Sequence, residues 1–90
     1  MSHIIKDKQK ITSRVNRIKG QLDAFAKAIE SEEDCYQVIQ LLASCRGAVN
    51  GLMADVVERH IREHIVEAEN KKDASDSAED LVDIMKSFLK

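Results

Sequence analysis

The sequence predicts an all-α protein, and three observations support this fold class. The 90 residues include three glycines and no proline, and proline costs about 3 kcal/mol inside a helix. Apolar residues recur at alternating steps of three and four positions, which places them on one side of a helix. Aromatic residues make up 3% of the chain, so aliphatic side chains, which suit contacts between helices, supply the apolar mass. The length corresponds to a single domain, residues 1–90.

Two long helices are expected, each with a continuous apolar seam. We place the first at about residues 4–30 and the second at about residues 33–66. The acidic residues 32–34 between them suit a helix N-terminus, where carboxylates meet the positive end of the helix dipole. The first seam consists of Ile11, Val15, Ile18, Leu22, Phe25 and Ile29, and the second of Val38, Leu42, Cys45, Val49, Leu52 and Val56.

A short third helix is expected at the end of the chain. Residues 67–77 have almost no large apolar groups and predict a loop. Ser77 then has the character of a helix cap, and residues 78–89 carry apolar groups at helical spacing. Two long antiparallel helices and a short third one leave the apolar seams only half covered, so partner subunits are required.

The charge is distributed unevenly along the chain. The first twenty residues hold six basic residues against Asp7 alone, a net charge of +5, whereas the whole chain has a net charge of −2. A basic helix on an acidic body is typical of a protein that binds a polyanion. The competing interpretation is a solvated helix face, and charge alone does not decide between them.

Composition also bears on the cellular location. Charged residues make up 33% of the chain, and no apolar run approaches the ~18 residues of a membrane span. The N-terminus lacks an apolar signal segment, so we expect a cytoplasmic protein without a membrane partner. In that compartment the two cysteines are expected to be thiols or metal ligands.

A small set of side chains has the character of a transition-metal site. His60 and His64 stand four residues apart, so their rings project from one face of the second helix. Glu63 between them is a candidate ligand or hydrogen-bond acceptor. Cys35 lies off the apolar seam and is the better candidate ligand, whereas Cys45 lies on the seam and is interpreted as a packing residue.

Distance then constrains the assembly. Cys35 and His60 would be about 37 Å apart on a straight helix, so one chain cannot place both on one ion. Antiparallel pairing of second helices would bring the thiol of one subunit beside the imidazoles of another. The amine of Ser2, after removal of Met1, and the ring of His3 could complete the site. Such a donor set suits Ni, Co, Zn or Cu.

Three motifs carry a resemblance to a known family. They are residues 14–21 (RVNRIKGQ), 45–53 (CRGAVNGLM) and 58–64 (ERHIREH). Over essentially its full length the chain resembles the CsoR/RcnR family of bacterial metal- or formaldehyde-responsive transcriptional repressors. The resemblance implies an all-helical homotetramer, a dimer of dimers with four-helix-bundle seams. It does not imply an enzyme, and no Gly-rich phosphate loop or Ser/His/Asp set is present.

The branches of this family differ in their sensory residues. Copper(I) and persulfide sensors carry a second cysteine where this chain has His64 or its neighbours, which disfavours both. The nickel/cobalt branch, RcnR, implies His3, Cys35, His60 and His64 as ligands of Ni(II) or Co(II), with Zn(II) or Cu as further metals in vitro. The formaldehyde branch, FrmR, has Glu at the place of His64 and bridges the N-terminal amine to the cysteine thiol. Ser2 and Cys35 leave that alternative open, and nickel or cobalt is preferred.

The resemblance also implies the DNA contacts and the mode of regulation. Double-stranded operator DNA would be bound by basic residues, for which the candidates are Lys10, Arg14, Arg17 and Arg46. Metal binding would release the operator and derepress metal efflux genes. A structural helical adaptor is the rival class, but it leaves the coincidence of the cysteine and three histidines unexplained.

Overall fold

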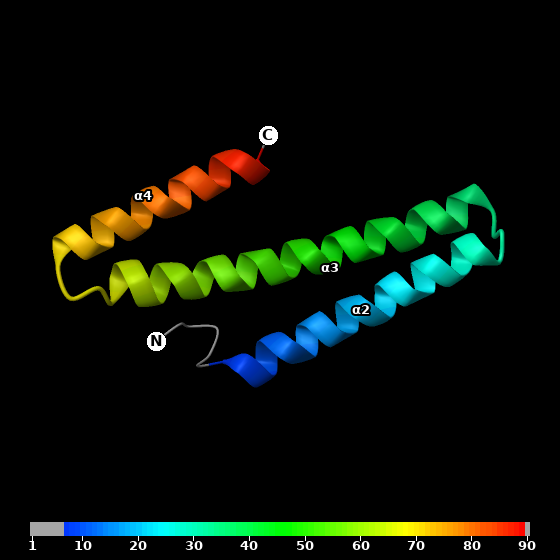
Figure 1. Cartoon of the computed structure of the whole chain (residues 1–90), viewed down its shortest axis with the longest axis horizontal. Helices are drawn as coiled ribbons and strands as arrows, with labels where there is room; N and C mark the ends of the chain where they lie inside the picture. The colour runs from blue at the N-terminus through cyan, green and yellow to red at the C-terminus, as the bar shows by residue number, and fades with distance from the viewer. Residues whose placement is uncertain (1–6, 90) are drawn as a thin grey trace. The chain divides into compact units, whose positions relative to one another are not determined.

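The computed structural model describes residues 7–89, and within that range the chain is helical with short connections and no strand. The elements are α2 (Lys8–Glu30), α3 (Cys35–Ile61), the π-helical turn η1 (Arg62–Val66) and α4 (Lys71–Phe88) (Figure 1). The predicted all-α class with three main helices is confirmed. The chain divides after Asp55 into two compact units, which are described separately.

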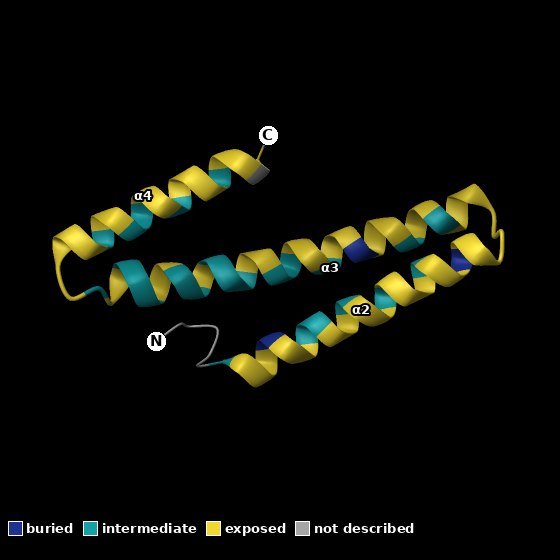
Figure 2. Ribbon diagram, viewed as in Figure 1, coloured by how far each residue is buried: buried dark blue, intermediate teal, exposed yellow. Residues whose placement is uncertain are grey.

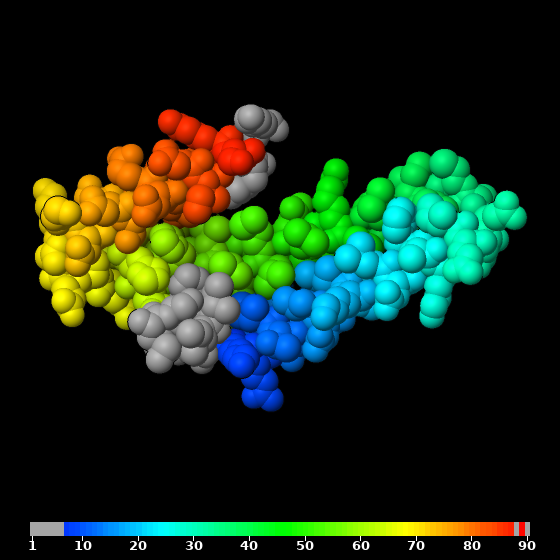
Figure 3. Space-filling view, in the orientation of Figure 1, coloured from blue at the N-terminus to red at the C-terminus, as the bar shows by residue number. Residues whose placement is uncertain are grey.

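The first unit is an antiparallel helical hairpin made of α2 and the first part of α3. The last turns of α2 lie directly against the first turns of α3 (Figure 3). Gln21 Nε2 donates a hydrogen bond of 3.2 Å to Ser44 Oγ across the hairpin. Nearer the open end, Arg14 Nη1 lies 3.5 Å from Asp55 Oδ2. Low residue numbers on α2 therefore pair with high ones on α3, as the predicted antiparallel arrangement requires.

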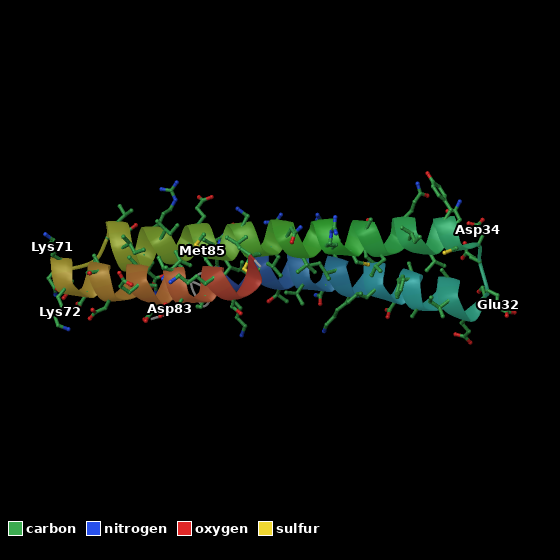
Figure 4. All side chains as sticks on the ribbon, turned by 90° about the horizontal axis from the view of Figure 1, so that it is seen from above. Glu32, Asp34, Lys71, Lys72, Asp83 and Met85 are labelled. Carbon is green, nitrogen blue, oxygen red and sulfur yellow. The ribbon has the colours of Figure 1, made fainter. Side chains whose placement is uncertain are left out.

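The connection between these helices is set by local hydrogen bonds. The amides of Glu32 and Glu33 donate to the carbonyls of Ile29 and Ala28, at 3.1 Å each. This pair of bonds forms a Schellman motif, which places its C′ residue in the left-handed region, and Glu32 has φ 55°. The Asp34 carboxylate then accepts a 3.0 Å bond from the Gln37 amide and caps the start of α3. Glu32 and Asp34 mark this turn in Figure 4.

The apolar seams are only partly covered within one chain (Figure 2). Ile11, Ala28 and Cys45 are the buried apolar residues of the described range. Leu22 and Leu42, both on the predicted seams, are 47% and 50% exposed. The half-covered seam agrees with the sequence analysis. It leaves a large apolar area in contact with solvent, which is uncommon for a stable monomer.

The second unit consists of the end of α3, η1 and α4, and α4 packs on η1. In η1 the Glu67 amide donates to the Arg62 carbonyl at 3.0 Å, the five-residue spacing of a π-helix. Lys71 and Lys72 are exposed at the first turn of α4 (Figure 4).

The expected loop 67–77 and the helix start at 78 are wrong, because α4 begins at Lys71. The cap is Asn70 and not Ser77: Asn70 Oδ1 accepts from the Asp73 amide at 2.8 Å, and Asn70 Nδ2 donates to Asp73 Oδ2 at 3.0 Å. The first bond satisfies one of the backbone amides that a helix start leaves without partners, and the second joins the two side chains. Polar side chains therefore begin the helix without help from the apolar pattern.

The other boundaries differ less from expectation. The expected start of the first helix at residue 4 lies outside the described residues, and α2 begins at Lys8. The second helix starts at Cys35, not at residue 33, and its expected end at residue 66 is the end of η1. No helix of the described range is long and apolar enough to cross a membrane.

Candidate metal and nucleic-acid sites

The centre of the candidate metal site is a pair of neighbouring imidazoles. His60 lies in the last turn of α3 and His64 in η1. Their ring centroids are 5.0 Å apart, with the ring planes tilted by 42°. Both residues are half-buried. Neutral imidazole nitrogens are common ligands of divalent transition metals, so the pair predicted from the spacing is present as two adjacent donors.

The orientation of the His60 ring is linked to α4. His60 Nε2 lies 3.4 Å from the backbone carbonyl oxygen of Ser77. A carbonyl oxygen only accepts, so a hydrogen bond at this contact requires the proton on Nε2, and the neutral ring then carries its lone pair on Nδ1. Ser77, which the sequence suggested as a helix cap, instead places its main-chain carbonyl near the His60 ring.

An acidic hollow surrounds the second histidine. It has a volume of about 370 Å³, and His64 and Glu63 lie in its wall. Its other acidic lining residues are Glu67, Glu69, Asp73 and Asp76. Carboxylates next to an imidazole favour a bound cation by charge. Glu63, proposed as a ligand or acceptor, is therefore placed beside His64 within the second unit.

The two cysteines have opposite environments. Cys35 is the first residue of α3 and is exposed, whereas Cys45 is buried and 3% exposed. The burial of Cys45 agrees with its interpretation as a packing residue, and Cys35, the predicted metal ligand, has an accessible thiol.

The described residues of one chain do not form a complete metal site. Within residues 7–89, no group of three or more His, Cys, Asp or Glu side chains could hold a metal ion. Ser2 and His3 lie outside the described residues. His60 and His64 lie together in the second unit, whereas Cys35 belongs to the first unit.

The basic residues predicted to contact DNA lie mainly along α2. Lys10 and Arg17 are exposed on this helix. Arg14 is partly exposed and is paired with Asp55 of α3. Arg46 is exposed on α3, where it borders an open apolar groove.

Sequence reasoning missed two contacts of these candidate sites, the Asp55 partner of Arg14 and the Ser77 carbonyl near His60. Both depend on which turns of separate helices face each other, and this register is not contained in the periodicity of either helix. The nearest signal in the sequence was Gly51, one turn before Asp55. Gly51 has no side chain, and this leaves room for Arg14 against α3.

Comparisons with known proteins identify the family. Residues 7–87 match the family described as metal-sensitive transcriptional repressor. The chain is 40% identical to the transcriptional repressor RcnR of Citrobacter koseri and 38% identical to RcnR of Salmonella paratyphi B, with both chains fully covered in each case.

A solved structure gives the same result. A Glu-to-His variant of the formaldehyde-responsive regulator FrmR from Salmonella enterica serovar Typhimurium matches with a TM-score of 0.83. The two sequences are 36% identical, and the match covers 92% of this chain and 94% of that one. The chain therefore belongs to the CsoR/RcnR family of metal-sensitive transcriptional repressors, which act on operator DNA and are not enzymes.

Proposed function

We propose that this chain represses transcription by binding operator DNA and releases the DNA when it binds Ni(II) or Co(II). The observation that carries the choice of metal is the imidazole pair, His60 and His64, with ring centroids 5.0 Å apart beside an acidic hollow. Nitrogen donors in an acidic surrounding suit a borderline divalent ion better than Cu(I), which prefers sulfur. The similarity to RcnR supports the same choice.

The proposed ligand set is completed by groups from outside this pair. Cys35 would supply a thiolate, and His3 and the Ser2 amine would supply nitrogen donors. Because Cys35 and His60 stand at opposite ends of α3, we assign the thiol and the imidazoles of one site to different protomers.

The proposed assembly is a homotetramer, and the apolar surface supports self-association. An open groove of about 670 Å³ on the first unit is lined by Leu22, Ile39, Leu42, Ala43, Cys45 and Val49, with Arg46 at its border. Several of these side chains are about half exposed in one chain. A second copy that covers this groove would bury them and would extend the helical seam.

The proposed DNA surface is the basic face of α2, with Lys10, Arg14 and Arg17, together with Arg46 of α3. Phosphate contacts from such side chains release counterions, so DNA affinity should fall steeply with salt. Effector binding would draw together donors from separate helices and change how α2 meets the phosphates. A coupling free energy of about 1–3 kcal/mol would weaken DNA binding about 5- to 150-fold and derepress metal efflux genes.

The test of the metal assignment is a titration of the purified protein with Co(II). We expect a sulfur-to-metal charge-transfer band that is absent in Cys35→Ala and retained in Cys45→Ala. A band that depends on neither cysteine would contradict the proposed thiolate ligand.

Formaldehyde sensing is the second candidate, and the structural similarity to the formaldehyde-responsive regulator FrmR favours it. Cys35 is exposed, so its thiol could react with formaldehyde and the N-terminal amine to form a methylene bridge with loss of water. His64 argues against formaldehyde sensing, because the FrmR branch carries Glu at this position. The matched FrmR structure is itself a variant in which histidine replaces a glutamate.

A DNA-release assay separates the two candidates. A DNA duplex selected from a random-sequence pool by the wild-type protein is titrated with protein and Ni(II), Co(II), Zn(II), Cu(I) or formaldehyde. Release by Ni(II) or Co(II) supports the metal assignment. Release by formaldehyde alone, with a protein mass increase of one carbon atom, supports the alternative.

A further inference from the structure

Arg14 has an acidic neighbour that the proposed function does not use. Its Nη1 lies 3.5 Å from Asp55 Oδ2, and the two side chains are 42% and 21% exposed. Its Nη2 lies over Gly51, where an added Cβ would be 3.4 Å away. Gly51 and Asp55 are one turn apart on α3, so the guanidinium lies along that face of the helix, and all three residues belong to the first unit.

We propose that Asp55 competes with DNA phosphate for Arg14 and thereby limits the affinity of the protein for DNA. This inference rests on the proposed role of Arg14 as a DNA contact. Asp55 of α3 would then affect DNA binding through Arg14 of α2.

The chemistry of the guanidinium is the reason for competition. It carries five N–H donors and no acceptor, and carboxylates and phosphates bind the same edges of this group. Arg14 is exposed enough for a phosphate to reach it, but that phosphate must come close to the Asp55 carboxylate. Two anions at one cation repel each other, so DNA either shares Arg14 at a cost or displaces Asp55.

The other two proposed DNA contacts on α2 provide a contrast. Lys10 and Arg17 are exposed and make no comparable ion pair within residues 7–89. Among the three proposed DNA contacts on α2, the competition therefore applies to Arg14. An ion pair as exposed as Arg14–Asp55 corresponds to roughly a twofold to fivefold change in an equilibrium constant.

The alternative is that the ion pair only fastens α2 to α3. In that case removal of the Asp55 charge would loosen the hairpin, and DNA affinity would stay the same or fall. The two interpretations predict opposite directions for the same variant, which makes the sign of the change decisive.

The experiment measures affinity for the selected duplex by fluorescence anisotropy at one salt concentration. The variants are Asp55→Asn, Arg14→Ala, the double variant, and Asp23→Asn as a control with the same charge change at an exposed position of α2. We expect Asp55→Asn to bind about twofold to fivefold more tightly. Arg14→Ala should bind more weakly, and Asp55→Asn should bring no gain in the Arg14→Ala background.

Three results would overturn the inference. They are unchanged or weaker binding by Asp55→Asn, a gain that persists without Arg14, and an equal gain from Asp23→Asn. Unchanged binding by Arg14→Ala would instead refute the proposed DNA contact itself, so the two failures are distinguishable. Thermal unfolding followed by circular dichroism checks the fold, and Asp55→Ser gives a second test if the amide variant unfolds.

Discussion

The imidazole Nε2 of His60 and the main-chain carbonyl oxygen of Ser77 lie 3.4 Å apart, which joins the end of α3 to α4. Side-chain substitution at Ser77 leaves this acceptor in place. The contact therefore links the His60 ring to the main chain of α4, a helix whose N-terminal cap is Asn70.

Asn70→Ala should lower the free energy of unfolding by about 1 kcal/mol, because the Asp73 amide loses its acceptor. Denaturant unfolding at fixed protein concentration measures the change. Lys72→Ala is the matched control. It removes an exposed ion pair with Asp76, at 3.1 Å, which should contribute less than about 0.5 kcal/mol to the free energy of unfolding. Equal losses in both variants would contradict the capping role.

His60→Gln and His64→Gln should each weaken Ni(II) and Co(II) binding by at least about tenfold, because each removes one of two adjacent imidazole donors. Competition with a chelator of known affinity measures the effect. Glu58→Gln, at an exposed position of α3, should bind metal as the wild type does. Wild-type affinity in either histidine variant would remove that residue from the ligand set.

The two cysteines should respond in opposite ways to replacement by serine. Cys45 is 3% exposed, so Cys45→Ser buries a hydroxyl and should cost about 1–3 kcal/mol of stability. Cys35→Ser, at an exposed site, should change stability by less than about 0.5 kcal/mol. Co(II) spectra should show the reverse, with the sulfur band lost only in Cys35→Ser. A stable Cys45→Ser protein would show that this position is more accessible than in the structure.

Glu32→Gly should stabilise the protein by roughly 0.5 kcal/mol. Glu32 has φ 55°, a conformation that costs an L residue about 1–2 kcal/mol. Glycine removes this strain, but its greater conformational entropy in the unfolded chain offsets part of the stabilisation. Glu33→Gly, where φ is not positive, should destabilise. Denaturation midpoints of the two variants give the comparison, and a loss in both would mean that strain at the turn is negligible.

The sequence predicted the fold class well because the apolar pattern alone defines α2 and α3. It failed at the start of α4, where residues 71–77 are polar and the helix is defined by the Asn70 cap. A pattern based on apolar spacing cannot detect a solvent-facing first turn, whereas a cap search at Asn70 and Asp73 could have done so.

The candidate site divides in the same way. The pairing of His60 with His64 follows from spacing within one helical segment, and the sequence predicted it. The contacts of Arg14 with Asp55 and of His60 with Ser77 join separate helices. Which turns face each other depends on how the helices pack, and the sequence of either helix alone does not determine it.

The scarcity of interior in a single chain has a thermodynamic consequence. Ile11, Ala28 and Cys45 are the buried apolar residues of the described range, so in the proposed homotetramer most of the free energy that opposes unfolding would come from association. Mass action would then make the melting temperature of that assembly rise with protein concentration. In a cell with few copies of this regulator, a smaller fraction of the copies would be folded, so the amount of functional protein would fall faster than the total amount.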